Sequence, residues 1–265
     1  MNFFSSQPTP FDLRWRMFGI PIRVHPTFWL FCWAFSYFYQ PIRNLHWGYT
    51  LLFIGLMFLA VLWHDLGHAL LIRLFGYRVQ IILFGMGGAP VGEFEQAKRW
   101  QRIVIHMGGP AAGFLLWLLT EQVKRFDPAG ANLVLWRGID FMLFETFLWN
   151  AMNLLPVIPL DFGEVMRELV SAVFRKKGRI LALMLSIIFA GLIAGYSEQI
   201  WRWAGQNWSP CFWVMQRLNP LVTAIFFGIY ALMNFFSLIG ELFAKRKDEE
   251  KPVEDEFAEP AERYT

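Results

Sequence analysis

The chain has few charged residues for its length. Only 17% of its 265 residues are Asp, Glu, Lys or Arg, whereas 56% are hydrophobic and 18% are aromatic. A soluble domain has about 25% charged residues, so this chain has too few polar side chains to cover an ordinary water-exposed surface. The shortage excludes a disordered protein and a nucleic-acid-binding protein, and it predicts an all-α protein that crosses a membrane several times.

The chain has only two cysteines, and its first residues do not have the pattern of a cleavable signal peptide. The two cysteines, Cys32 and Cys211, fall in an apolar stretch and in an aromatic segment, so we expect no disulfide between them. This excludes a small secreted domain that depends on disulfides. Arg14, Arg16 and Arg23 are spread through the first residues without a long apolar core, and we therefore expect no signal peptide.

Six apolar stretches are bounded by proline, glycine and charged residues. They cover residues 27–45, 48–72, 103–123, 133–155, 180–197 and 220–243. A helix needs about 20 residues to cross roughly 30 Å of hydrocarbon. We therefore expect about six transmembrane helices in one membrane domain over residues 1–247. The first stretch is the weakest of the six, because Pro41 and Arg43 interrupt its end.

Two segments outside these stretches have their own character. In the internal loop at residues 76–101, strand-favouring residues are followed by several glycines, which predicts a short β-hairpin after the second span. The tail at residues 248–265 is acidic, contains two prolines and has no apolar periodicity, so we expect it to be disordered.

The basic residues are unevenly distributed over the predicted loops. If six spans place both termini on one side, most of the 24 Lys and Arg residues lie on that side. Cytoplasmic loops of membrane proteins carry an excess of basic residues, so both termini are predicted to be cytoplasmic. The expected location is a prokaryotic plasma membrane.

Three ionisable residues, His64, Asp65 and His68, lie within the second predicted span. Such groups cost about 2.5–3.5 kcal/mol each at membrane depth on insertion scales, so their presence indicates a function. Residues four apart share one helical face, and two imidazoles so placed can bind one metal ion, with Asp65 within reach of a metal-bound water. The alternative interpretation is a pair of histidines hydrogen-bonded to neighbouring helices.

A third metal ligand is available later in the chain. A catalytic zinc site usually has three protein ligands and leaves one position for water. Pro156 and Pro159 interrupt the fourth predicted span, and Asp161 follows them on the side where the second span ends. Topology therefore brings Asp161 to the depth of the two histidines and predicts a zinc site.

The two metal motifs, in this order, resemble those of the site-2 proteases, a family of intramembrane zinc metalloproteases. The family has H-E-x-x-H on one span and N-x-x-P-x-x-x-L-D-G on a later one. This chain has His64-Asp-Leu-Gly-His68 and the segment that runs from Asn153 to Gly163. The resemblance includes residues 19–25, the glycine-rich loop at 85–88, and residues 109–113, which we expect to form a turn.

The resemblance implies how the site works. His64, His68 and Asp161 would hold Zn²⁺, and a zinc-bound water would attack a peptide bond in the transmembrane helix of a substrate protein. Asp65, which replaces the family's glutamate, would be the general base. The substrate backbone would be held by Asn153 and by the strand edge at residues 81–91 with Gly87 and Gly88.

Two features of the sequence suggest other assignments. Asp is one methylene shorter than Glu, about 1.5 Å of reach, so the chain is alternatively a catalytically impaired relative that binds metal and membrane proteins. Glu164, three residues after Asp161, would supply part of the base function, or else form an ion pair with Arg167. A third class is a metal or proton transporter that uses Glu145 and the histidines.

Overall fold

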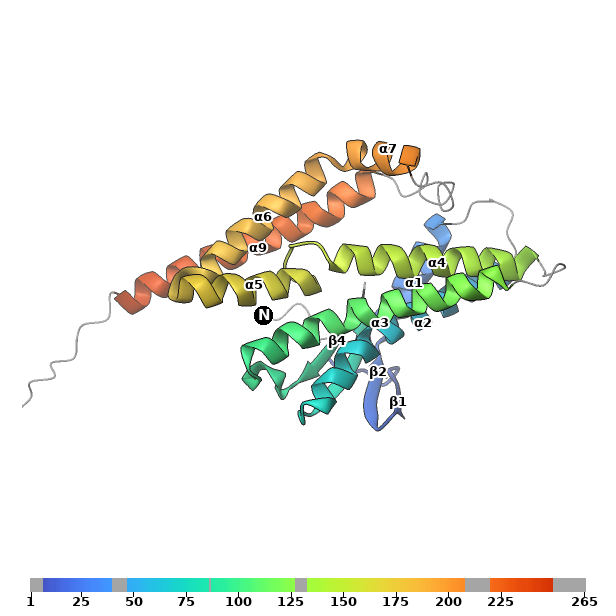
Figure 1. Cartoon of the computed structure of the whole chain (residues 1–265), viewed down its shortest axis with the longest axis horizontal. Helices are drawn as coiled ribbons and strands as arrows, with labels where there is room; N and C mark the ends of the chain where they lie inside the picture. Colours follow the sequence, from blue (N-terminus) through green and yellow to red (C-terminus); the bar gives the residue numbers. More distant parts are fainter. Residues whose placement is uncertain (1–6, 40–46, 86, 127–132, 208–219, 250–265) are drawn as a thin grey trace, which may run out of the picture.

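The computed structural model of the chain describes residues 7–39, 47–85, 87–126, 133–207 and 220–249. Most of these residues are helical, and a small four-stranded sheet accounts for the other extended structure (Figure 1). Among the described residues, four helices are long and apolar enough to cross a membrane, which confirms the predicted class. They are α2 (Trp47–Leu74), α3 (Arg99–Arg125), α6 (Gly178–Gly195) and α9 (Pro220–Glu249).

The other two predicted spans form helices that do not meet the same requirements. Helix α1 (Pro26–Tyr39) has 14 residues and is about 21 Å long at 1.5 Å per residue, and residues 40–46 lie outside the described part of the chain. Helix α4 (Leu133–Asn153) has 21 residues but includes Arg137, Asp140 and Glu145. Its middle, residues 141–146, is buried by protein, so lipid does not surround Glu145. The expected count of six spans is thus only partly confirmed.

The sheet consists of two hairpins joined by a parallel pair. Strands β3 (Val79–Phe84) and β4 (Gly87–Gly92) pair antiparallel, which confirms the hairpin predicted after the second span. Strands β1 (Leu13–Met17) and β2 (Ile20–Val24) form the other hairpin, and β2 pairs parallel with β3. The order β1-β2-β3-β4 places β4 at one edge of the sheet.

The first hairpin was not predicted, although its residues carry a signal for it. Polar and apolar side chains alternate through β1, and the two residues that connect the strands, Phe18 and Gly19, both have positive φ angles of 51° and 74°. Positive φ at both positions is typical of the tight two-residue turn that matches strand twist. The parallel pairing of β2 with β3 joins distant parts of the chain, and no local pattern indicates it.

One face of the sheet packs on the helices and forms most of the core. Ile22, Val24, Ile81 and Leu83 are at most 1% exposed and share an apolar cluster with Val61 and other residues of α1, α2 and α4. Burial of an aliphatic side chain of this size contributes roughly 1.5–3 kcal/mol. This packing holds the β3–β4 hairpin beside the half of α2 that carries the two histidines.

The chain is not helical between α4 and α5 (Asp161–Phe174). Residues 154–160 include Pro156 and Pro159, which lack an N–H and cannot continue a helix. Beyond this break α5 lies next to α6, and α6 and α9 run side by side (Figure 1). The remaining elements are η1 (Glu93–Gln96), η2 (Arg175–Lys177) and α7 (Ser197–Asn207).

The predicted disordered tail is almost wholly outside the described residues. Its first two residues, 248 and 249, end α9, and residues 250–265 are not described. The division into a membrane domain and a tail therefore stays a prediction.

Helices α2 and α3 approach each other closely at glycine residues. A Cβ added at Gly67 would collide with the carbonyl oxygen of Gly108 and would lie 2.6 Å from the Cβ of Ala112. Small residues allow two helix backbones inside a membrane to touch in this way. Because Gly67 lies between His64 and His68 in sequence, this contact presses that part of α2 against α3.

We expect Gly67→Ala to destabilise the protein, because the added methyl group forces α2 and α3 apart. Overpacking costs about 2 kcal/mol, which corresponds to a melting temperature about 4–8 °C lower for a chain of this size. The measurement is thermal unfolding of the purified chain in detergent. Gly191→Ala on α6 is the control, since its added Cβ meets nothing within 4 Å. Equal melting temperatures for the two variants would contradict the close contact.

Candidate metal centre

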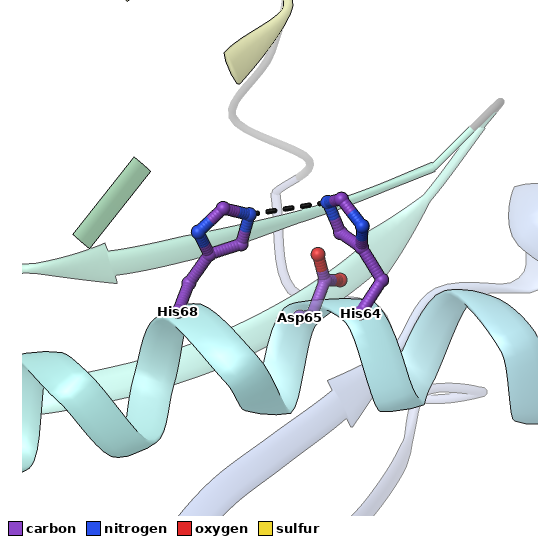
Figure 2. A group of neighbouring side chains, drawn as sticks. All are labelled: His64, Asp65 and His68. Carbon is purple, nitrogen blue, oxygen red and sulfur yellow. Dashed lines mark hydrogen bonds between the residues drawn. The ribbon is translucent and has the colours of Figure 1, made fainter. Parts of the chain in front are cut away.

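Two histidine side chains meet on the buried side of α2. His64 and His68 are 3% and 2% exposed, and their Nε2 atoms lie 3.1 Å apart. Figure 2 shows both rings on the same side of α2, with Asp65 between them. The helical spacing predicted this arrangement, since residues four apart share one face.

Asp161 joins the two histidines from a different helix. It is the first residue of α5, and its Oδ2 lies 3.1 Å from His64 Nε2 while its Oδ1 lies 3.2 Å from His68 Nε2. The proline-containing break between α4 and α5 turns the chain so that the carboxylate points at both rings. The structure thus brings together the three residues that the sequence predicts as metal ligands.

The other ring nitrogens are held by acceptors. His64 Nδ1 is 2.8 Å from Asn150 Oδ1, and His68 Nδ1 is 2.7 Å from the carbonyl oxygen of Ile105. The Asn150 side chain is oriented by its own Nδ2, which donates to the carbonyl oxygen of Thr146 at 2.5 Å. The Asn150 oxygen cannot donate, so His64 carries its hydrogen on Nδ1 and keeps a lone pair on Nε2. His68 Nδ1 lies 2.7 Å from the Ile105 carbonyl oxygen and 3.2 Å from the nitrogen of the Gly109 N–H, and the shorter contact favours the same tautomer.

This donor set fits a zinc ion. Two lone pairs and a carboxylate within 3.2 Å of one another repel unless a cation or a proton lies between them. Tetrahedral zinc with ligands at about 2.0–2.1 Å would place its donor atoms about 3.3 Å apart, close to the separations observed here. Imidazoles whose second nitrogen donates to an oxygen are the usual form of metal-binding histidine.

Two glycines of α3 make the space that this arrangement needs. A Cβ at Gly109 would collide with His68 Nε2 and would lie 2.6 Å from His64 Nε2, and a Cβ at Gly113 would collide with the amide of Asn150. The predicted turn at residues 109–113 is wrong, because these residues lie inside the continuous helix α3 with Pro110 in its interior. Their role is to leave room beside the imidazoles and Asn150, which only the tertiary contacts reveal.

Asp65 is buried beside the two histidines. One nitrogen of each histidine and a carboxylate oxygen of Asp65 lie within 4.8 Å of one another. Asp65 Oδ2 has no hydrogen-bond partner in the described part of the chain, and a Cβ at Gly88 would collide with it. The carboxylate therefore reaches from α2 to the backbone of β4, with an acceptor that is free to take a proton.

Two of the three residues predicted to bind substrate lie in the edge strand. Gly87 and Gly88 are in β4, and Asn153 ends α4, where its Nδ2 donates to the carbonyl oxygen of Trp149 at 2.9 Å. Trp149 itself was not predicted. Its ring lies within 3.2 Å of the position of a Cβ on Gly87, and its Nε1 has no partner among the described residues. Tryptophan is too common in this sequence for its position alone to have indicated this contact.

Glu164 forms the ion pair that was the alternative to an accessory base. Its Oε2 is 2.7 Å from the guanidinium of Arg167, one turn further along α5. A role for Glu164 as a base stays a prediction.

A second ion pair joins α5 to α3. Glu168 accepts hydrogen bonds from the guanidinium of Arg102 at 2.9 and 2.7 Å. Burial raises the pKa of Glu168, but the hydrogen bonds and charge of Arg102 outweigh this and hold that pKa below its ordinary value. Arg102 also donates to the backbone oxygens of Glu95 and Ala97 after β4, so one guanidinium connects α3, α5 and the end of the sheet.

Sequence comparison relates the chain to known metalloproteases. It is 29% identical over 161 residues to a zinc metalloprotease of Methanocaldococcus jannaschii, covering 59% of this chain and 44% of that protein. It is 30% identical over 167 residues to a putative zinc metalloprotease of Synechocystis sp., covering 58% and 42%. A putative zinc metalloprotease of Mycolicibacterium smegmatis, Rip2, is 36% identical over 92 residues. The chain spans less than half the length of the first two relatives.

The chain was also compared with models of protein families and with solved structures. The chain matches no model of a known protein family. In structure it is similar to the site-2 protease from Methanocaldococcus jannaschii over 81% of this chain and 94% of that one, with 21% sequence identity and a TM-score of 0.48. The names of the sequence relatives and the buried donor set both support zinc as the metal. By its sequence matches, the chain is similar to zinc metalloproteases.

Proposed function

We propose that the chain is an intramembrane zinc metalloprotease that hydrolyses a peptide bond in the transmembrane helix of a substrate protein. The observation that carries this proposal is the convergence of His64, His68 and Asp161, with 3.1–3.2 Å between their donor atoms, beside a buried carboxylate with a free oxygen. The named activity of the sequence relatives supports it.

His64, His68 and Asp161 would hold the zinc ion, and Asn150 with the Ile105 carbonyl would keep the two imidazoles in the binding tautomer. When bound, zinc supplies a Lewis acid that lowers the pKa of water to about 7 and polarises a carbonyl group. Asp65 accepts the proton from the attacking water and returns it to the leaving amine. Its burial between α2 and β4 keeps bulk water away from this transfer.

The position of β4 at the edge of the sheet supports substrate binding by strand addition. No other strand of the described residues pairs with the outer edge of β4, next to Asp65, so an extended substrate segment would add to the sheet there. Gly87 and Gly88 allow close approach because they have no side chains, and Asn153 at the end of α4 would hold another part of the substrate backbone. A transmembrane helix must unwind before it can pair in this way.

The distribution of basic residues supports a topology for this enzyme. With α1 and α4 counted beside the four apolar helices, six crossings place both termini in the cytoplasm, as the excess of Lys and Arg favours. The connections from α2 to α3 and from α5 to α6 then face the cytoplasm, which is the side from which water would enter.

One observation favours a second function. The general base of the family is a glutamate, and Asp65 is one methylene shorter, which matters because misplacement of a catalytic group by about 1 Å costs on the order of 10²-fold in rate. The second candidate is therefore a relative that retains the metal and binds membrane proteins without cleaving them. The transporter hypothesis has less support, since Glu145 is distant in sequence from the three donors and lies on buried α4.

The proposal is tested by zinc content and cleavage of a panel of transmembrane helices in detergent or nanodiscs. We expect His68→Ala to lose zinc and all cleavage. Asp65→Asn should keep zinc but cleave at least about 10²-fold more slowly, because a general base contributes about 10²–10⁴-fold. His25→Ala is the control, since the His25 ring contacts the Thr27 side chain rather than the site. Native cleavage by His68→Ala would refute a metalloprotease.

Asp65→Glu distinguishes the two candidate functions. We expect the native chain to cleave and Asp65→Glu to be slower by up to about 10²-fold, because the longer side chain has to fit where Asp65 already meets β4. Cleavage by Asp65→Glu alone would instead identify an impaired enzyme, and no cleavage by either chain, with zinc present, would identify a binding protein. The measurement is single-turnover cleavage at equal zinc content.

Gly109→Ala tests whether the space beside the imidazoles is the metal site. The added methyl group would occupy the region next to both Nε2 atoms, so we expect zinc affinity to fall by at least about 10-fold, as for other changes around a metal site. Zinc affinity is measured by competition with a chelator. Gly55→Ala on α2 is the control, because its Cβ would meet nothing within 4 Å, and equal affinity of the two variants would place the metal elsewhere.

A further inference from the structure

The segment before Asp161 is not helical, so its backbone N–H and C=O groups lack the hydrogen-bond partners that a helix provides. Inside a membrane protein, backbone N–H and C=O groups that lose their helical partners need other partners. Between α4 and α5, the N–H groups of Leu154, Leu155, Val157 and Leu160 donate to nearby backbone oxygens, and the two prolines have no N–H. Ile158 is different, because its partners come from elsewhere in the fold.

Two side chains from two helices hold the backbone of Ile158. Its N–H donates to Ser186 Oγ of α6 at 2.8 Å, and its carbonyl oxygen accepts from Asn234 Nδ2 of α9 at 2.7 Å. Asn234 Nδ2 also donates to the Tyr230 carbonyl oxygen at 2.8 Å, and since both acceptors are carbonyl groups the orientation of this amide is determined. Ser186 is fully buried and Asn234 is 3% exposed.

The segment that contains Ile158 packs tightly against the first turn of α5, which begins at Asp161. A Cβ at Gly163 would collide with the backbone of Val157 and would lie 2.6 Å from the nitrogen of Ile158, so the segment is folded tightly against the first turn of α5. Val157 and Leu160 pack in a second apolar cluster with Ala190 of α6 and Phe227 of α9. Displacement of Ile158 would therefore move the residue that begins α5.

We propose that Ser186 and Asn234 are positioning residues that fix Ile158 and thereby set the place of Asp161 opposite His64 and His68. This proposal rests on the metal site described above. Neither residue touches the site itself, and they act through the segment between the helices. Loss of either hydrogen bond leaves a buried backbone group without a partner, and the segment shifts to satisfy it.

The test uses the full chain in detergent with zinc or with Co²⁺, whose visible absorption reports the coordination geometry. Ser186→Ala and Asn234→Leu each release a different group of Ile158. We expect each to lower the affinity for zinc by about 10–100-fold, as changes in residues that orient metal ligands do. The Co²⁺ spectrum of each variant at saturation should change in intensity and band position.

Two variants serve as matched controls. Ser237→Ala removes a hydroxyl on α9 that donates to the Met233 carbonyl oxygen of its own helix, and Ser186→Thr keeps the hydroxyl that Ile158 needs. Both should retain native affinity and the native spectrum. A fall in melting temperature alone does not produce the expected pattern, because a purely structural role predicts a native Co²⁺ spectrum in every variant that folds.

The outcomes separate this proposal from the proposed function. Native zinc affinity and a native Co²⁺ spectrum in both Ser186→Ala and Asn234→Leu would overturn the positioning role and leave the metal site intact. The same loss in Ser237→Ala would also overturn it. A native chain that binds neither metal would overturn the metal site and the positioning role together. If one of the two variants fails to fold, the other still decides the matter.

Discussion

Two imidazole nitrogens and a carboxylate meet at one buried point and repel one another unless a cation or a proton lies between them. In the tautomer that the shortest contacts favour, the hydrogens of His64 and His68 lie on Nδ1, next to Asn150 and the Ile105 carbonyl oxygen, and the facing Nε2 atoms keep their lone pairs. Each surrounding helix supplies one part of this arrangement. Helix α3 provides open space at Gly109, α4 provides Asn150, and α5 begins with Asp161.

The sheet brings a different element to the same place. Strand β4 lies next to Asp65 at one edge of the sheet, where we propose that an extended peptide pairs. Peptide hydrolysis needs a proton acceptor and an extended substrate. Asp65 would supply the acceptor, and the edge of β4 beside it would hold the substrate. The replacement of glutamate by Asp65 makes the separation of α2 and β4 important, because the shorter side chain leaves less tolerance in the position of the carboxylate.

Local patterns in the sequence predicted what depends on local geometry. His64 and His68 followed from helical spacing, Asp161 from the prolines and the order of the spans, and the hairpin at β3 and β4 from its composition. Contacts between distant segments were not predictable in this way. The roles of Gly109 and Asn150, and the pairing of β2 with β3, depend on which helices and strands become neighbours. The count of six spans is only partly confirmed, because α1 is short and α4 includes Arg137, Asp140 and Glu145.

The central claim is that one metal ion is bound by His64, His68 and Asp161 together. X-ray absorption spectroscopy at the zinc edge of the purified native chain tests it most directly, with Asp161→Ala measured beside it. The account predicts a first shell of two imidazole nitrogens and oxygen donors at about 2.0–2.2 Å, without sulfur, and the loss of one oxygen donor in Asp161→Ala. A sulfur ligand, or a spectrum that Asp161→Ala leaves unchanged, would contradict it.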